Sequence, residues 1–261
     1  MNKTVALITD FGLKDHYVGV MKGRILKELG DLNFNFINLI DITHEIPPYN
    51  IRKGAITLYF SYKYFPTGTI FLVVVDPGVG TERKAIVVKT KDYIFVGPDN
   101  GIFTLIYEEN PDFLAFEIIE EKILKPPYSE TFHGRDLFAP IVAYILNEKP
   151  LEEISVPLSK NNVNKIEFLF PEKTSRGLKL SIWDIDHFGN LITNFHKSMI
   201  KHKFKIFVNK KEVPLIKSYG YAKKGEIVAL FGSEGLLEIA IREGSAFEVL
   251  QNPDIEIIWE E

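Results

Sequence analysis

The stretch Thr4-Val5-Ala6-Leu7-Ile8-Thr9-Asp10-Phe11-Gly12 opens the chain with a short apolar run that ends in a polar, glycine-containing loop. Apolar residues at positions 18, 21, 25 and 29 then recur at helical spacing, which predicts an amphipathic helix. A strand, a loop and a helix in this order are typical of an α/β layered fold. In such folds, the loops at the carboxyl ends of the strands collect ligand-binding groups.

The same alternation continues through the first half of the chain. Strands are predicted at residues 34–40, 70–75, 85–88 and 93–96, and helices at residues 53–62 and 136–146. This mixture predicts an N-terminal α/β domain over residues 1–158 with a mostly parallel central sheet.

The pattern changes after Pro157. Short strands of period two are predicted at residues 179–183, 205–208, 226–230 and 237–241, separated by Gly, Asn and Lys turns. The polar run Ser159–Lys165 indicates a linker, which we assign to residues 159–170. Residues 171–261 are then expected to form a smaller, all-β domain.

Composition limits the classes of partner. The chain has 261 residues, 46% of them hydrophobic, and a formal net charge of −4, so it can bury a sizeable core and has no global basic field for nucleic acid. Apolar runs such as Ile70–Val75 are far shorter than the roughly 20 residues of a membrane helix. Met1–Lys3 leads into a strand-like segment rather than a signal peptide. A cytoplasmic protein without membrane association is expected.

Two aspartates and a histidine are candidate site residues in the first domain. Asp10 and Asp76 each follow an apolar strand, where carboxylates either bind ligands or cap the next turn. In Thr131-Phe132-His133-Gly134-Arg135-Asp136, the glycine permits close approach of a ligand to His133, and the flanking Arg and Asp can fix its orientation. A purely structural histidine is the alternative.

Glycine-rich loops add weaker signals. The segment 76–83 is only superficially similar to a phosphate-binding loop, because it lacks the Gly-Lys-Ser/Thr ending. Gly97-Pro98-Asp99-Asn100-Gly101 is interpreted as a turn followed by a helix start. Phe231-Gly232-Ser233-Glu234-Gly235 is a further glycine-flanked loop that is compatible with a simple turn.

The segment Asp184-Ile185-Asp186-His187-Phe188-Gly189-Asn190 ends a strand in carboxylates, an aromatic ring and an amide. An aromatic face with an Asn amide suits stacking and edge recognition of a planar base, and a hairpin with a polar turn is the alternative. The histidines lack metal-ligand spacing, and the absence of cysteine excludes thiolate nucleophiles and cysteine-bound zinc. No metal site is predicted.

Five of these segments, taken in order, resemble the S-adenosylmethionine hydroxide adenosyltransferase family, which is related to the fluorinases and chlorinases. They run through nearly the whole chain: Thr9-Asp10-Phe11-Gly12, Asp76-Pro77-Gly78-Val79-Gly80, Gly97-Pro98-Asp99-Asn100-Gly101, Thr131-Phe132-His133-Gly134-Arg135-Asp136 and Asp186-His187-Phe188-Gly189-Asn190.

The resemblance implies an N-terminal α/β domain joined to a β-barrel-like C-terminal domain, assembled as a homotrimer with active sites between subunits. It implies attack of water on C5′ of S-adenosylmethionine, which gives adenosine and L-methionine. S-adenosylmethionine is the substrate in this reaction, and neither a cofactor nor a metal is needed.

The resemblance also implies roles for individual residues. The family's Asp, Arg and His at the attacking water match Asp76, Arg83 and His133. Substrate contacts carry over to six further positions: Asp10 for the ribose hydroxyls, Phe188 and Asn190 for the adenine, Asp186 for the methionine ammonium, and Ser233 and Glu234 near the methionine end. Glu234 stands where the halogenases tend to carry Arg for the substrate carboxylate. The contact to the methionine carboxylate is therefore the role that the resemblance supports least.

One departure separates the branches of this superfamily. Fluorinases carry Tyr followed by Ser, and chlorinases Tyr followed by Gly, in the segment that matches His133-Gly134, and they do not keep the Asp and Arg partners. This chain has His133 together with Asp76 and Arg83. The resemblance therefore favours hydrolysis over halogenation.

The chemistry fits a site that positions water. A sulfonium leaves as a neutral thioether, so alignment of the nucleophile dominates, and assistance by a general base typically contributes ~10²- to 10⁴-fold. Asp76 beside Arg83 should be a weak base. Our hypothesis is that Asp76 and His133 orient one water while Arg83 fixes Asp76 and offsets charge.

Three other functions stay open on the sequence alone. A halogenase would use halide in place of water, and a non-catalytic protein would bind S-adenosylmethionine or adenosine without turnover. A metal-dependent phosphoesterase would need convergent metal ligands, for which the sequence offers no spacing.

Overall fold

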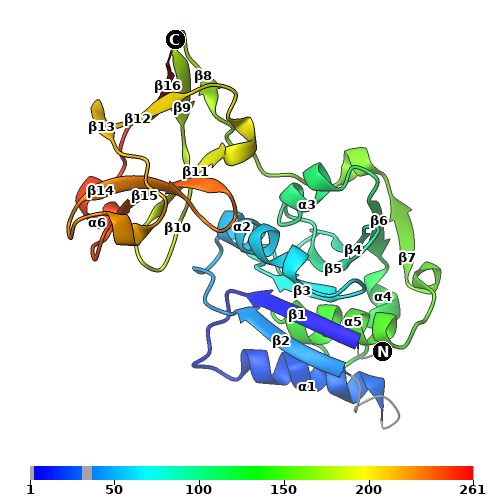
Figure 1. Cartoon of the computed structure of the whole chain (residues 1–261). Helices are drawn as coiled ribbons and strands as arrows, with labels where there is room; N and C mark the ends of the chain where they lie inside the picture. The colour runs from blue at the N-terminus through cyan, green and yellow to red at the C-terminus, as the bar shows by residue number, and fades with distance from the viewer. Residues whose placement is uncertain (1–2, 31–36, 261) are drawn as a thin grey trace. The chain divides into compact units, whose positions relative to one another are not determined.

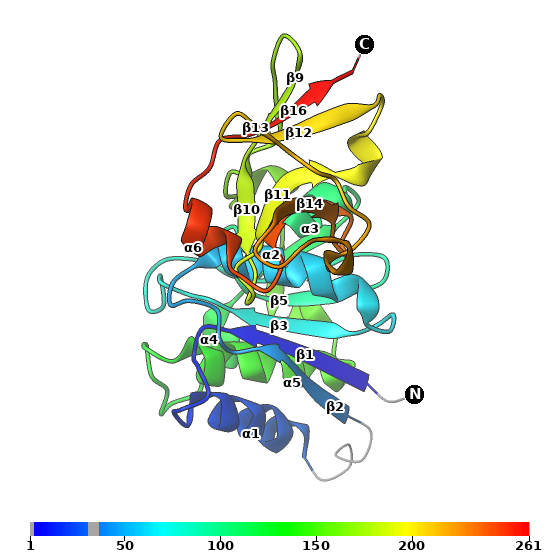
Figure 2. The same cartoon turned by 60° about the vertical axis from the view of Figure 1, so that its left-hand side comes forward.

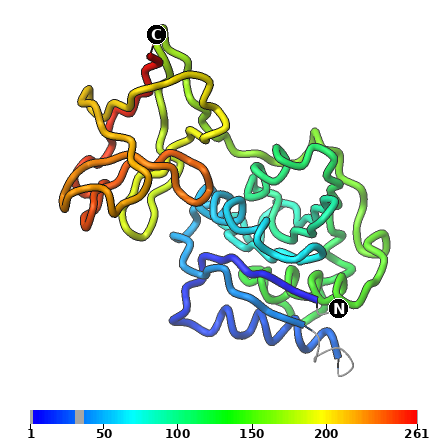
Figure 3. Tube along the Cα trace, in the orientation of Figure 1, coloured from blue at the N-terminus to red at the C-terminus, as the bar shows by residue number. Residues whose placement is uncertain are grey.

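A computed structural model describes residues 3–30 and 37–260. The chain divides into two compact units, Met1–Ile166 and Glu167–Glu261. Each unit is one continuous stretch of chain, as the Cα trace in Figure 3 shows. Of the strand predicted at 34–40, residues 34–36 lie outside the described residues.

The first unit is built on a mixed sheet, which in the described residues has the strand order β2-β1-β3-β5-β4-β6-β7. The pairings β1 with β2, β1 with β3 and β3 with β5 are parallel, whereas those along β5-β4-β6-β7 are antiparallel. The α/β class is confirmed, and the parallel pairing is confined to one half of the sheet. The strands are β1 (Lys3–Thr9), β2 (Ile37–Thr43), β3 (Ile70–Val74), β4 (Ala85–Lys89), β5 (Ile94–Pro98), β6 (Leu114–Ile118) and β7 (Ser155–Leu158).

Helices cover both faces of this sheet. Figures 1 and 2 show α1 and α5 together on one face and α2 and α3 on the other. The helices of this unit are α1 (Tyr17–Leu29), α2 (Ile51–Ser61), α3 (Thr104–Glu109), α4 (Glu120–Ile123) and α5 (Ala139–Leu146). Shorter helical turns are η2 (Tyr62–Tyr64), η3 (Gly134–Phe138), η4 (Leu151–Glu153) and η5 (Lys160–Asn162).

The apolar periodicity of α1 faces the core as predicted. The four residues of α1 buried in the structure are Val18, Met21, Ile25 and Leu29. Leu7 of β1 packs in the same cluster, because alternate residues of a strand point to opposite faces of the sheet. On the other face, Phe71 and Phe95 stack with ring centroids 5.2 Å apart. Each face of the sheet therefore has its own apolar layer.

The helix predicted at 136–146 is two elements. Residues 134–138 form the π-helical turn η3, in which the amide of Ala139 donates to the carbonyl of Gly134, and α5 follows. Pro140 has no N–H to donate to the carbonyl four residues earlier, so the α-helical ladder cannot run through this point. The wider turn immediately follows His133.

The end of the first unit is fixed by a buried carboxylate. Asp99 is 2% exposed, and its Oδ1 accepts the backbone N–H of Asn164 at 2.9 Å. The Asn164 amide donates to the Asp99 carbonyl at 2.8 Å and to Oδ2 at 3.1 Å. Asn100 donates to the carbonyl of Val75 at 2.9 Å. Gly97 and Pro98 thus end β5, and the predicted turn is confined to residues 99–101, which anchor residues assigned to the linker.

Replacing Asp99 by alanine should lower the free energy of unfolding by about 1–3 kcal/mol, because the Asn164 N–H would lose its buried acceptor. Urea denaturation would measure the change, with Asp92→Ala on the exposed β4–β5 turn as the control. Equal stability of the two variants would contradict the anchoring role of Asp99.

The second unit is mainly antiparallel. In the described residues its sheets have the orders β10-β11-β15-β14 and β13-β12-β16-β9-β8. The strands are β8 (Glu172–Lys173), β9 (Gly177–Leu180), β10 (Ile182–Ile185), β11 (Leu191–His196), β12 (Phe204–Val208), β13 (Lys211–Val213), β14 (Ile227–Phe231), β15 (Leu236–Ile241) and β16 (Ile255–Trp259). The helical elements are α6 (Ala246–Leu250), η6 (Lys197–Met199) and η7 (Tyr219–Tyr221).

The strand predicted at 179–183 is broken in the middle. Its first part belongs to β9 and its second part to β10, which lie in different sheets. At the break, Ser181 accepts the N–H of Asn194 at 3.0 Å and donates its own N–H to the Asn194 side chain at 3.1 Å. The backbone groups of Ser181 are thereby satisfied where the chain changes sheets.

Among residues 3–30 and 37–260, no helix combines the length and the apolar character needed to cross a membrane.

Candidate active site

The parallel half of the sheet brings two predicted aspartates to one edge. Strands β1 and β3 are neighbours, and Thr9 at the end of β1 pairs with Val74 at the end of β3. Asp10 follows the first strand directly, and Asp76 follows the second after one residue. Because parallel strands share their carboxyl edge, both carboxylates lie on the same side of the sheet.

The antiparallel half brings two more charged residues to this edge. Ala85 at the start of β4 pairs with Pro98 at the end of β5, so Arg83 precedes β4 at the carboxyl edge. Strand β6 reverses again, with Glu117 opposite Ile86, and Glu120 therefore follows β6 at the same edge. The change of strand direction places these two residues beside the aspartates.

The guanidinium of Arg83 is the centre of the cluster. Its Nε lies 3.1 and 3.0 Å from the two carboxylate oxygens of Asp76, and its Nη2 lies 2.7 Å from Oδ2. The same Nη2 is 2.8 Å from Nδ1 of His133. The side chains of Arg83 and Asp76 are only 9% and 5% exposed. The three residues predicted for catalysis are therefore in direct contact.

The contact with Arg83 defines the state of His133. Arginine can only donate, so Nδ1 of His133 must accept, and the ring is neutral with its hydrogen on Nε2. Burial lowers the pKa of His133, and the charge of Arg83 lowers it further. His133 therefore offers a hydrogen-bond donor at Nε2 rather than a positive charge.

Activity is expected to fall below pH 6.5, the ordinary pKa of histidine, as the pH passes through the lowered pKa of His133. Protonation of Nδ1 would break the bond from Arg83. Because the pKa of His133 is lower in the folded protein, the unfolded chain binds the proton more readily. The contribution of neutral His133 to the free energy of unfolding is therefore complete above pH 6.5, and it decreases as the pH falls toward the folded pKa. Rate profiles and urea denaturation between pH 4.5 and 8 would measure both effects. An acid limb that persists in His133→Ala would assign it to another group.

His133 is not oriented by its sequence neighbours. Arg135 donates to Asp136 at 2.7 and 2.6 Å, and its guanidinium lies 5.1 Å from the ring of Phe132. Asp136 also accepts the N–H of Ser129 at 2.8 Å. The predicted orientation of His133 by Arg135 and Asp136 is thus wrong, because those two pair with each other and the histidine pairs with Arg83.

Asp10 borders this cluster. Its Oδ2 accepts the backbone N–H of Tyr49 at 2.9 Å. Burial raises the pKa of Asp10, the bond from Tyr49 opposes this, and the charge of Asp76 adds to the increase. The repulsion from Asp76 indicates that the two carboxylates share one electrostatic environment.

Three predicted residues of the second unit, Asp186, Phe188 and Asn190, are joined by hydrogen bonds. Oδ1 of Asp186 accepts the backbone N–H groups of Phe188 and Asn190, both at 2.9 Å, and Oδ2 accepts the Asn190 amide at 2.8 Å. The Asn190 amide lies 3.3 Å from the hydroxyl of Tyr219, which donates to Glu238 at 2.6 Å. Burial raises the pKa of both Tyr219 and Glu238.

Asp186 thus folds the turn that presents Phe188. Phe188 is 74% exposed, whereas Asn190 is 5% exposed. On the loop between β14 and β15, the hydroxyl of Ser233 donates to Glu234 at 3.1 Å. An exposed ring next to a partly buried polar network is the arrangement expected of a binding surface for a planar group.

Glu120, Tyr219 and Glu238 were not predicted from the sequence. Glu120 lies in an unremarkable charged run, and only the pairing of β4 with β6 brings it to Arg83. Tyr219 lies on the short turn η7 and Glu238 in the alternating strand β15. None of the three stands in a motif, so the sequence carried no signal for them.

No group of three or more His, Asp or Glu side chains in the described part of the chain is arranged to hold a metal ion.

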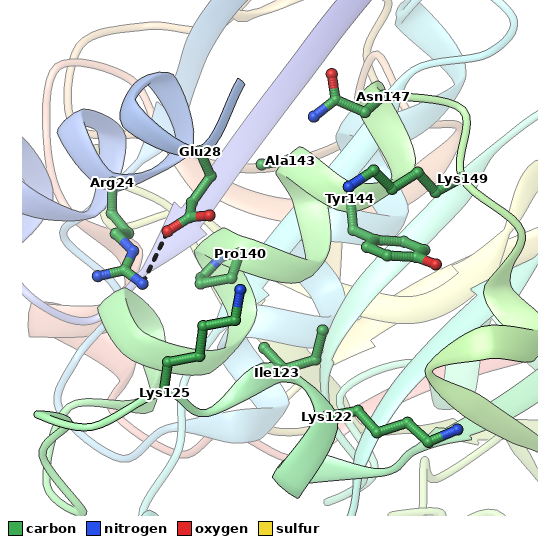
Figure 4. A pocket seen from close by; sticks show the side chains of 10 residues that line it. All are labelled: Arg24, Glu28, Lys122, Ile123, Lys125, Pro140, Ala143, Tyr144, Asn147 and Lys149. Carbon is green, nitrogen blue, oxygen red and sulfur yellow. Dashed lines mark ion pairs between the residues drawn. The ribbon is translucent and has the colours of Figure 1, made fainter. Parts of the chain in front are cut away.

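A pocket of about 130 Å³ on the first unit is lined by residues of α1, α4 and α5 and their flanks (Figure 4). It contains no predicted site residue. Arg24 pairs with Glu28 at 2.9 Å there, and Lys122, Lys125 and Lys149 lie near the C-terminal ends of α4 and α5, where cations stabilise a helix.

The fold and the site define a two-unit protein, α/β and then antiparallel β, with an Asp, Arg and His cluster at the sheet edge. The family models for the SAM hydroxide adenosyltransferase N-terminal and C-terminal domains match residues 5–155 and 180–253. The chain belongs to this family.

Several relatives resemble the chain over most of its length. A protein of Methanocaldococcus jannaschii named (R)-S-adenosyl-L-methionine hydrolase is 38% identical, covering 98% of this chain and 95% of that protein. A protein of the same name from Thermus thermophilus is 33% identical, covering 95% of each. A fluorinase from Actinoplanes is 27% identical over 76% of this chain and 73% of its own length.

Solved structures are similar as well. A conserved uncharacterized protein from Thermotoga maritima superposes with a TM-score of 0.84 and 37% identity, covering 97% of this chain and 99% of that one. A conserved hypothetical protein from Thermus thermophilus has a TM-score of 0.79 and 31% identity, covering 99% of this chain and all of the other.

Proposed function

We propose that this protein hydrolyses S-adenosyl-L-methionine to adenosine and L-methionine by attack of water on the ribose C5′. The observation that carries the proposal is the direct contact of Arg83 with both Asp76 and His133. These are the residues that the family places at the attacking water. Relatives at 33% and 38% identity are named (R)-S-adenosyl-L-methionine hydrolase.

In the proposed reaction, the water oxygen forms a bond to C5′ while the bond from C5′ to sulfur breaks. The electron pair goes to sulfur, which leaves as the neutral thioether of methionine, and a water proton is released to solvent. A neutral leaving group needs no general acid, so the site chiefly has to hold water in line.

The cluster is suited to this task. Asp76 would accept a hydrogen bond from the water, and the Nε2–H of His133 would donate one to its oxygen. Arg83 holds Asp76 through two of its nitrogens, which makes the carboxylate a well-fixed acceptor. Positive charge on Arg83 would offset the negative charge that develops on the attacking oxygen.

The substrate contacts are also part of the proposal. Asp10 would bind the ribose hydroxyls. Phe188 would pack on the adenine, and Asn190 would bind its edge. Asp186 would face the methionine ammonium, with Ser233 and Glu234 near the methionine end. Support comes from the exposure of the Phe188 ring and from the remaining acceptor capacity of the Asp186 carboxylate beside three bonds to its own turn.

We further propose that the protein acts as a cytoplasmic homotrimer, with active sites between subunits, and needs no metal or cofactor. The proposed substrate contacts are divided between the two compact units, and the family resemblance implies that neighbouring chains complete each site. Light scattering after size-exclusion chromatography would give the mass of the assembly.

Incubation with S-adenosyl-L-methionine in EDTA, with and without chloride, tests the function. Adenosine and methionine in equal amounts and in excess over protein, regardless of chloride, are expected. A 5′-halogenated nucleoside would assign the protein to the halogenase branch. Adenosine retained without turnover would assign a binding role, and loss of activity in EDTA would require a metal.

A further inference from the structure

The guanidinium of Arg83 is bonded on the side away from Asp76 as well. Its Nη1 lies 3.4 Å from Oε1 of Glu120, the first residue of α4. The ring of Phe138 lies 5.1 Å from the guanidinium carbon. Asp76, His133 and Glu120 together therefore occupy all three nitrogens of Arg83.

We propose that Glu120 is a positioning residue for the reaction, because it holds Nη1 so that Nη2 meets Asp76 and His133 at once. This inference rests on the proposed function, since the rate of hydrolysis is what the positioning would serve. Glu120 would act through Arg83, without contact to water or substrate.

Several carboxylates lie around this end of Arg83, and Glu120 is the one that pairs with Nη1. A cavity of about 370 Å³ beside Arg83 is lined by Glu82, Glu117, Glu120 and Glu121, among other residues. Glu117 is paired with Lys84 at 2.6 Å, whereas Glu120 makes the ion pair with Arg83. The two pairs lie side by side across β4 and β6, so Glu117 is a matched control in the same cavity.

Burial supports a fixed role for Glu120. Its side chain is 30% exposed, and that of Arg83 is 9% exposed. Burial raises the pKa of Glu120, while Arg83 favours its charged form. A partly buried pair of this kind is screened less by salt than a fully exposed pair.

Three substitutions show whether Glu120 acts through its contact with Arg83 or through its charge alone. Glu120→Ala removes the contact and is expected to lower kcat about 10-fold, within the range of coupling between residues in contact, with KM nearly unchanged. Glu120→Gln keeps the reach of the side chain and an acceptor oxygen, and should retain most of the rate. Glu120→Asp keeps the charge but withdraws it by one methylene, and should behave like the alanine variant.

The control Glu117→Ala should leave kcat unchanged. In an Arg83→Lys background, Glu120→Ala should cost nothing further, because the group that it positions is already gone. Full activity of Glu120→Ala, an equal loss in both backgrounds, or a rate kept by Asp and lost by Gln would each overturn the positioning role.

A measurement without substrate separates this inference from the proposed function. The ¹⁵N signals of the His133 ring report whether Nδ1 accepts a hydrogen bond with the hydrogen on Nε2. The wild type and Glu120→Gln should show this state, and Glu120→Asp should show its loss. Unchanged signals in Glu120→Asp would overturn the inference, whereas a wild type that forms no adenosine would overturn only the proposed function.

Discussion

Replacing His133 by alanine is expected to lower kcat by roughly 10²- to 10³-fold, the usual contribution of one preorganised hydrogen-bond donor at a reacting centre, with little change in KM. His133 is 5% exposed and neutral, with its Nδ1 occupied by Arg83. Its remaining function is the donor at Nε2, which would act on the attacking water rather than on the bound substrate. Steady-state rates over a range of S-adenosyl-L-methionine concentrations would separate the two constants.

A second variant shows which nitrogen of His133 matters. Asparagine carries an acceptor oxygen near the position of Nδ1 but has nothing at the position of Nε2. His133→Asn should therefore keep the bond from Arg83 and still lose activity as far as the alanine variant does. Recovery of the rate in His133→Asn would mean that His133 serves only to anchor Arg83, and wild-type turnover in both variants would remove it from the mechanism.

The second large effect is expected for Arg83→Lys. Lysine keeps the charge but is a single ammonium, which cannot span Asp76, His133 and Glu120 as the planar guanidinium does. Displacement of Asp76 and His133 from their positions at the water should lower kcat by ~10²-fold, the usual cost of misplacing groups at a reacting centre by about 1 Å. Because Asp76 would keep a cationic partner, the loss in folding stability should be smaller than in Arg83→Ala.

Arg83→Ala should reduce the free energy of unfolding by about 3–5 kcal/mol, because the carboxylate of Asp76 would stay buried without its partner. Arg135→Lys is the matched control, since Arg135 also binds an aspartate through two nitrogens but its side chain is 36% exposed. Rates and urea denaturation of the three variants give the comparison. Wild-type kcat in Arg83→Lys would show that the shape of the guanidinium is not needed.

Local pattern was sufficient for several elements, although strands such as β6, β11 and β16 were not predicted. The spacing of positions 18, 21, 25 and 29 predicted the buried face of α1, and the apolar run before Asp76 predicted β3. The α/β class followed from the order of such elements. These features depend on residues close in sequence, for which periodicity is informative.

Features that depend on distant residues could not be predicted in this way. Arg83 and His133 are 50 residues apart, and Glu120 reaches Arg83 only because β4 and β6 pair antiparallel. Nothing in the alternating pattern at 179–183 indicates that the chain passes from one sheet to the other at Ser181. The π-helical turn before Pro140 was missed because helical periodicity does not distinguish it from an α-helix.

The source of the oxygen in the product tests the central claim most directly. Turnover of S-adenosyl-L-methionine in ¹⁸O-labelled water, followed by mass spectrometry of both products, would locate the new bond. Attack of water on C5′ predicts one ¹⁸O atom in the adenosine and none in the methionine. Unlabelled adenosine, or a nucleoside that carries halide in place of oxygen, would contradict hydrolysis at the ribose carbon.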